Sequence, residues 1–167
     1  MSRNGDVGLI RIAGIVKESI VDGPGLRYVI FTQGCHHYCE GCHNQHTWDL
    51  KGGEPISISA LVEKMQAEIT ELHQGITISG GEPFIWSGPL ARFCEQIRRW
   101  NPNLDIMVYT GFRFAELNAR SHQLFLRYID ILVDGPFIKE LADPTLKWRG
   151  SSNQRILYLD ERRAIAP

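Results

Sequence analysis

The sequence lacks the features of a membrane, secreted or nucleic-acid-binding protein. Its 167 residues contain no apolar run close to the roughly 18 residues that a membrane-spanning helix needs. The opening stretch MSRNGDVGLI lacks the long apolar core of a secretion signal. The formal net charge of −1 provides no basic excess for a nucleic-acid or membrane surface. We therefore expect a cytoplasmic protein that binds neither nucleic acid nor a membrane.

Cysteine is scarce, and its distribution is uneven. Cys35, Cys39 and Cys42 lie within eight residues in the segment FTQGCHHYCEGCHNQ, and Cys94 is the fourth and last cysteine. Three clustered cysteines cannot pair among themselves without leaving one over, and in a cytosolic chain such a group is more often metal-binding or catalytic. Cys94 follows Phe93 in a helix-like segment, where we expect it to be a small buried hydrophobe.

Short apolar segments alternate with patterns of helical spacing along the chain. We expect strands at 27–31, 75–79, 105–110, 130–134 and, as a strand or a packed tail, 155–159, and helices at 59–73, about 88–100 and about 113–128. Such alternation is typical of βαβ crossovers. The sequence therefore predicts one α/β domain over 1–167: a partial (βα) barrel of about five or six mostly parallel strands with outer helices, open on one side.

Polar and glycine-rich motifs follow four of the predicted strands. The cysteine segment follows 27–31, GGEP follows 75–79, Thr110 and Gly111 end the next strand, and Asp134 and Gly135 end the one after it. Ligands in α/β sheets bind beyond the carboxyl ends of the strands. We therefore expect these four motifs to meet at one site.

The spacing C-x3-C-x2-C admits three interpretations. With His43 or His46 as a fourth ligand it could hold zinc, although structural zinc sites usually use two separated pairs of ligands. The C-x2-C part alone could be redox-active, which leaves Cys35 without a role. A four-iron, four-sulfur cluster normally takes four cysteines, so three would leave one iron open for a ligand that is not protein.

The cysteine motif followed by SGGEP resembles the radical S-adenosylmethionine enzymes. The resemblance implies that the three clustered cysteines hold a 4Fe-4S cluster and that S-adenosylmethionine chelates the open iron. It also implies that the segment Gly80, Gly81 and Glu82 contacts the amino group of S-adenosylmethionine, the glutamate through its carboxylate.

Longer segments narrow the resemblance to one branch. VDGPGLRYVIFTQGCHHYCEGCHN resembles the glycyl-radical-enzyme activases, and ILVDGPF with DPTLKWRGSSNQRIL resembles the activases of anaerobic ribonucleotide reductase. This implies a 5′-deoxyadenosyl radical that takes a hydrogen atom from a glycine of the reductase, after a flavodoxin-like or other low-potential donor has supplied an electron. The alternatives are activation of another glycyl radical enzyme, radical chemistry on a small molecule, or a non-enzymatic zinc-binding adaptor.

Four further residues enter the site through this resemblance. Gly41 and His43 flank the last clustered cysteine and are candidates for lining the adenine pocket, with polar surface as the alternative for His43. Thr110 and Asp134 are candidates for hydrogen bonds to the ribose or methionine part. Either side chain could instead cap the turn that follows its strand.

Overall fold

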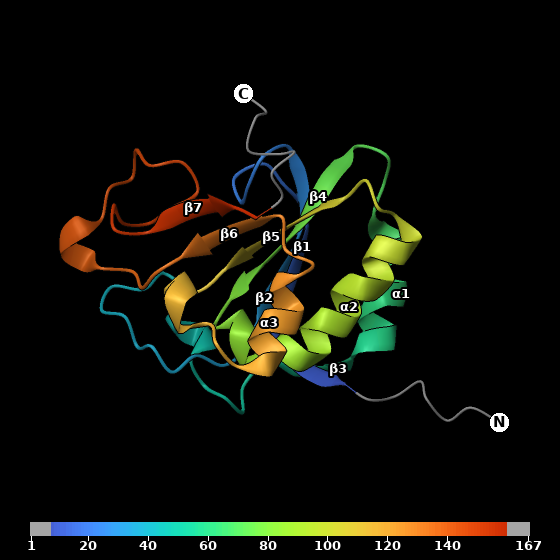
Figure 1. The fold of residues 1–167 in the computed structure, drawn as a ribbon, viewed down its shortest axis with the longest axis horizontal. Helices are drawn as coiled ribbons and strands as arrows, with labels where there is room; N and C mark the ends of the chain where they lie inside the picture. The colour runs from blue at the N-terminus through green and yellow to red at the C-terminus, as the bar shows by residue number, and fades with distance from the viewer. Residues whose placement is uncertain (1–7, 160–167) are drawn as a thin grey trace.

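The computed structural model describes residues 8–159, which form an open sheet covered by helices (Figure 1). The described strands are β1 (Leu9–Ser19), β2 (Leu26–Thr32), β3 (Glu54–Ser57), β4 (His73–Gly80), β5 (Asp105–Tyr109), β6 (Ile131–Asp134) and β7 (Arg155–Tyr158). The α-helices in this range are α1 (Ile58–Glu68), α2 (Ser87–Trp100) and α3 (Arg120–Leu126). No helix of this range is long and apolar enough to cross a membrane.

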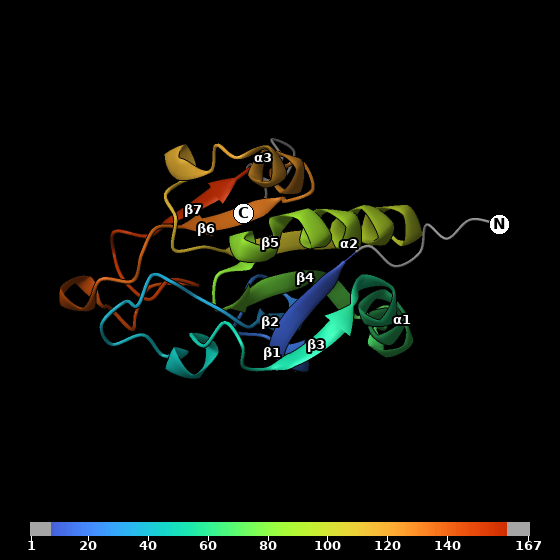
Figure 2. The ribbon, with the colours of Figure 1, turned by 90° about the horizontal axis from the view of Figure 1, so that it is seen from below.

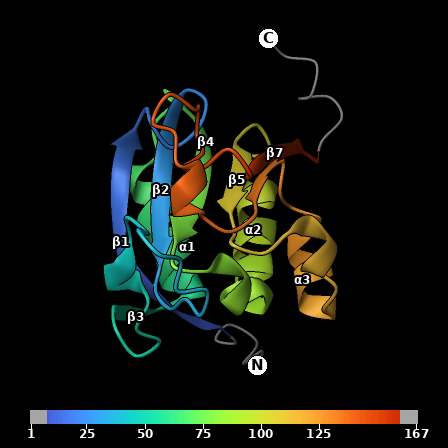
Figure 3. The same cartoon turned by 90° about the vertical axis from the view of Figure 1, so that its left-hand side faces the viewer.

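The sheet over 8–159 has seven strands in the order β3-β1-β2-β4-β5-β6-β7. Strands β2, β4, β5 and β6 run parallel, whereas β1, β3 and β7 pair antiparallel at the two sides. The α/β class is confirmed, and so is the opening on one side, because the sheet does not close and β1 and β7 lie at opposite sides of the view (Figure 3). The barrel itself is not confirmed. The expected parallel character holds only for the central strands, since a tight connection such as that between β1 and β2 suits antiparallel pairing.

Two predicted helices are shorter than expected. Helix α1 is capped by the hydroxyl of Ser57, which accepts from the Ala60 backbone N–H, and it ends at Glu68 rather than at residue 73. The segment 113–128 contains a 3₁₀ turn and only then α3. In that segment, the Phe114 backbone N–H donates to the Asp134 carboxylate at the end of β6, which holds the chain against the sheet instead of in a helix.

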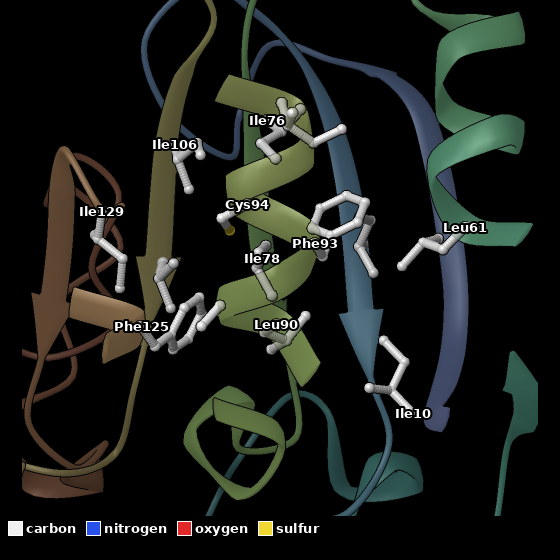
Figure 4. Close-up of a cluster of buried hydrophobic side chains, with 14 of the residues drawn as sticks. Ile10, Leu61, Ile76, Ile78, Leu90, Phe93, Cys94, Ile106, Phe125 and Ile129 are labelled. Carbon is white, nitrogen blue, oxygen red and sulfur yellow. The ribbon is translucent and has the colours of Figure 1, made fainter. Parts of the chain in front are cut away.

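The helices cover one face of the sheet and form the main core with it (Figures 2 and 4). Phe93 and Cys94 of α2 are fully buried between sheet residues such as Ile78 and Ile106. Cys94 is thus the buried hydrophobe that the sequence predicts, and burial raises the pKa of its thiol.

The opposite face of the sheet is partly polar. Arg27 on β2 is fully buried there and donates to Asp105, to the Thr77 hydroxyl and to the carbonyl of Pro24 in the turn between β1 and β2. Burial lowers the pKa of Arg27 to about 10, which leaves it charged at neutral pH. The side chain therefore holds the turn to the centre of the sheet.

Candidate active site

A pocket of about 150 Å³ lies at the carboxyl ends of the four parallel strands. Six of the ten residues proposed from the sequence line it: Cys35, Cys39, Cys42, Gly80, Gly81 and Thr110. The other four do not: Gly41, His43, Glu82 and Asp134. The structure therefore brings the motifs at the strand ends together, although not every side chain in them faces the pocket.

Backbone hydrogen bonds fix the beginning of the cysteine loop. The Gly34 N–H donates to the Thr47 carbonyl at 2.7 Å, and the Gly34 carbonyl accepts from the Glu82 N–H at 2.7 Å. The three cysteines of the loop are free thiols; Cys35 is buried, and Cys39 and Cys42 are half-buried. The loop thus presents three sulfur atoms that form no disulfide to one pocket.

Gly80 and Gly81 allow the end of β4 to lie against the cysteine loop. Gly80 has a φ of +100°, which favours glycine, and a Cβ there would lie closer than 3.0 Å to the Thr32 backbone. At Gly81 a Cβ would come equally close to the Gly34 carbonyl. The sequence predicts these glycines against a ligand, and the structure adds that both are needed for the close approach of two backbone segments.

Glu82 has different partners from those expected. Its carboxylate is 0% exposed and accepts from the Phe84 N–H at 3.0 Å, the Thr110 hydroxyl at 2.8 Å and the Gly111 N–H at 2.8 Å. The second oxygen also lies 2.6 Å from His37 Nε2. Four donors, all from the protein, fill the roughly four lone-pair sites of a carboxylate, whereas the resemblance predicts a pairing with an ammonium group.

The Asp134 carboxylate also accepts hydrogen bonds from protein groups. It is 1% exposed and accepts from Arg155 of β7 at 3.0 Å and 2.5 Å and from the Phe114 N–H at 2.7 Å. These bonds hold β7 and the segment after β5 to the end of β6, and the bond to a ribose or methionine group stays a prediction. Thr110 does line the pocket, while its hydroxyl donates to Glu82 and accepts from the Phe112 N–H.

Gly41 and His43 lie beside the pocket rather than in it. Gly41 has a φ of +76° in the turn between two cysteines, close to Phe137 and Lys139. His43 lines an adjoining groove of about 650 Å³, with its ring centroid 6.0 Å from that of Phe137. Phe137 lines both spaces, whereas His43 lines the groove and not the pocket.

Sequence reasoning did not assign most of the remaining wall of the pocket. The additional lining residues are His37, Asn44, Thr47, Trp48, Ser79, Tyr109, Gly111, Gly135, Phe137 and Gln154. For three of these residues the sequence offers a clue to their place in the site. Ser79 and Tyr109 are the last side chains of their strands, and Phe137 follows the Asp-Gly-Pro turn at the end of β6. Gln154 lies just before β7, and nothing in its local sequence distinguishes it from an ordinary surface residue.

Comparison with known proteins identifies the family. The family model of a 4Fe-4S single cluster domain matches residues 21–157. The anaerobic ribonucleoside-triphosphate reductase-activating protein of Salmonella typhi is 42% identical over 145 residues, which span 84% of this chain and 93% of that protein. The protein of the same name from Escherichia coli strain K12 is 39% identical over the same shares of both chains. The chain belongs to this family of activating proteins.

More distant similarities have also been found. The protein of the same name from Enterobacteria phage T4 is 34% identical over 139 residues, which span 81% of this chain and 86% of the phage protein. Among solved structures, QueE from Escherichia coli matches with a TM-score of 0.48 and 18% identity, over 62% of this chain and 53% of that chain.

The cysteine loop fits the cofactors of this family, a 4Fe-4S cluster and S-adenosylmethionine. Thiolates are the usual ligands of such clusters, and the pocket is lined by three free cysteines that can supply them. Burial raises the pKa of the Cys35 thiol, and bound iron would displace its proton. Among residues 8–159, no three His, Cys, Asp or Glu side chains are grouped to hold a single metal ion. A cluster does not need that arrangement, because each thiolate binds a different iron.

Proposed function

We propose that the pocket at the strand ends is where this activating enzyme cleaves S-adenosylmethionine to generate the glycyl radical of anaerobic ribonucleoside-triphosphate reductase. The observation that carries the proposal is the grouping of three free cysteines and the Gly80–Gly81 backbone around one pocket. Membership of the family, whose members are named as activators of that reductase, supplies the reaction partner. When bound, the cluster supplies one electron to the sulfonium, which yields methionine and a 5′-deoxyadenosyl radical.

Six residues of the pocket wall receive a role from their chemistry. Cys35, Cys39 and Cys42 hold the cluster as thiolates. Gly80 and Gly81 present backbone without side chains, so that the methionine part of the ligand can lie against the end of β4. The Thr110 oxygen keeps one acceptor position beyond its two protein bonds, which we assign to a ligand N–H or O–H.

Aromatic side chains give the pocket its protection from water. Tyr109, Phe137 and Trp48 all line it. A primary alkyl radical attacks almost any C–H bond, so the chemistry requires the exclusion of water and a target held close to the radical. We assign both tasks to these apolar walls.

The adjoining groove is the entry route that we propose for the glycine-bearing segment of the reductase. Val21 and Asp22 of the turn between β1 and β2 line it, as do Trp148 and Arg149 of the segment before β7. Its volume of about 650 Å³ is several times that of the pocket, and Tyr109 lies at the border of both. A peptide segment in the groove would therefore reach the place where the radical forms.

Three further statements rest on the sequence. We propose that a flavodoxin-like or other low-potential protein supplies the electron, that one domain over 1–167 carries the function, and that the protein acts in the cytoplasm. Reduction of the cluster by purified flavodoxin and its reductase tests the first of these. A cluster that only dithionite can reduce would contradict it.

Electron paramagnetic resonance tests the function directly. The anaerobically reconstituted protein is mixed with S-adenosylmethionine, a reductant and anaerobic ribonucleoside-triphosphate reductase, and the sample is frozen. We expect about four irons per chain and a glycyl doublet on the reductase. Cleavage of S-adenosylmethionine without a doublet would refute the partner, and a colourless protein with one zinc and no iron would refute the chemistry.

A further inference from the structure

The Glu82 carboxylate connects three segments that are far apart in the sequence. Through its two oxygens it binds the Phe84 N–H of its own turn after β4, Thr110 and Gly111 after β5, and His37 of the cysteine loop after β2. Each of these strand ends contributes residues to the pocket. One buried side chain outside the pocket thus links the three strand ends that line it.

The bond to His37 is the one that reaches the proposed cluster ligands. His37 lies between Cys35 and Cys39, and its side chain is 16% exposed. The same Glu82 oxygen accepts from the Gly111 N–H, and we assign His37 Nε2 as the donor to it across the 2.6 Å contact. Hydrogen bonds to charged groups are stronger than those between neutral groups, and burial strengthens them further.

The packing around His37 fits this bond. A Cβ on Gly111 would lie closer than 3.0 Å to the His37 ring, so a side chain at this position would displace the ring. The Phe112 ring stands edge-on to His37, with ring centroids 4.7 Å apart. The ring is therefore held from two sides in the position where its nitrogen meets Glu82.

We propose that Glu82 is a positioning residue that fixes the Cys35–Cys39 segment through His37. The inference rests on the proposed function, because it concerns how the loop is set to hold its cluster. Glu82 acts from outside the pocket, without touching the bound ligand. Loss of the His37 bond frees the loop between two of the three cysteines, and the cluster is then lost more easily.

Variants of His37 separate this role from a contact with S-adenosylmethionine. His37→Phe keeps a ring but removes the donor, while His37→Gln keeps an N–H donor at a similar reach. His36→Phe is the matched control, because the neighbouring exposed ring contacts Phe112 but has no bond to Glu82. Glu82→Gln is the second variant, since an amide keeps the shape but loses acceptor sites.

The first measurement is the rate at which an iron(II) chelator removes iron from the reduced, reconstituted protein without S-adenosylmethionine. We expect about tenfold faster release from His37→Phe, near wild-type rates for His37→Gln and His36→Phe, and the fastest release from Glu82→Gln. The spectrum of the reduced cluster, recorded before S-adenosylmethionine is added, should change in His37→Phe and recover in His37→Gln.

The second measurement does not require a cluster. Hydrogen exchange of the metal-free protein should show faster exchange of the Gly111 amide in Glu82→Gln and of the 35–39 amides in His37→Phe. Exchange and iron release at wild-type rates in His37→Phe would overturn the inference, as would failure of His37→Gln to rescue. A Glu82→Gln variant that only binds S-adenosylmethionine more weakly would overturn it in favour of direct contact. A wild type without a cluster refutes the proposed function, while hydrogen exchange still tests the Glu82 links.

Discussion

Gly81→Ala tests whether the close approach of β4 to the cysteine loop sets up the site. Gly81 does not have a left-handed φ, so alanine is not excluded by backbone conformation. The new Cβ would, however, lie closer than 3.0 Å to the carbonyl group of Gly34. The carbonyl carbon and oxygen that this Cβ would meet are backbone atoms, which cannot rotate away as the end of a side chain can.

The magnitude follows from the two interactions that must change. Overpacking by one methyl group in a tight site costs about 1–3 kcal/mol. Moving Gly34 also breaks or stretches the 2.7 Å bond from the Glu82 N–H to its carbonyl, at about 1 kcal/mol. For a chain of this length, a loss of about 2–4 kcal/mol lowers the melting temperature by about 10 °C.

Thermal unfolding followed by circular dichroism, together with iron content after reconstitution, checks this prediction. Gly88→Ala is the control, because a Cβ there meets nothing within 4 Å and alanine favours the helix α2. We expect Gly88→Ala to melt at or slightly above wild type with full iron content, whereas Gly81→Ala melts lower and retains less iron. A Gly81→Ala protein that melts within about 2 °C of wild type with full iron content would refute the reasoning.

Three further changes have defined outcomes. Alanine at any one of the three proposed cluster ligands should abolish S-adenosylmethionine cleavage, while Cys94→Ala should preserve it, because Cys94 is buried in the core away from the pocket. Glu68→Gln should weaken the acid dependence of stability. A hydrogen bond from Tyr28, with nearby lysines, lowers the pKa of Glu68 to about 2, so its contribution of about 1 kcal/mol is complete above pH 4.5 and lost as the pH falls towards 2. Arg27→Met should cost about 3 kcal/mol or more in urea unfolding, because it removes buried bonds to Asp105 and to the β1–β2 turn.

Each of these predictions has a result that would contradict it. Cleavage that survives the loss of a clustered cysteine would remove that residue from the ligand set. A Glu68→Gln variant that loses stability between pH 4.5 and 2 as steeply as wild type would contradict the role of Glu68. An Arg27→Met protein with an unchanged urea midpoint would mean that the buried arginine is not what holds the turn.

The fold could be predicted where local patterns decide it. The strands 75–79 and 130–134 and the helix α2 are each close to their predicted bounds, because their apolar residues repeat with a clear period. Strand β3 was missed because it is only four residues long and contains Pro55, which disfavours a strand in isolation. It exists because β1 provides a partner edge.

The sequence by itself determined the chemistry of the site. Three cysteines at fixed spacing and a glycine pair after a strand are short-range features, and the pocket contains all five residues. Tertiary structure alone decided which charged side chains face that pocket. Glu82 follows β4 and Asp134 ends β6, as expected, yet each accepts from donors in distant segments, because a buried carboxylate must have its acceptor sites filled. Those donors come from other strand ends, and only the assembled sheet brings them within reach.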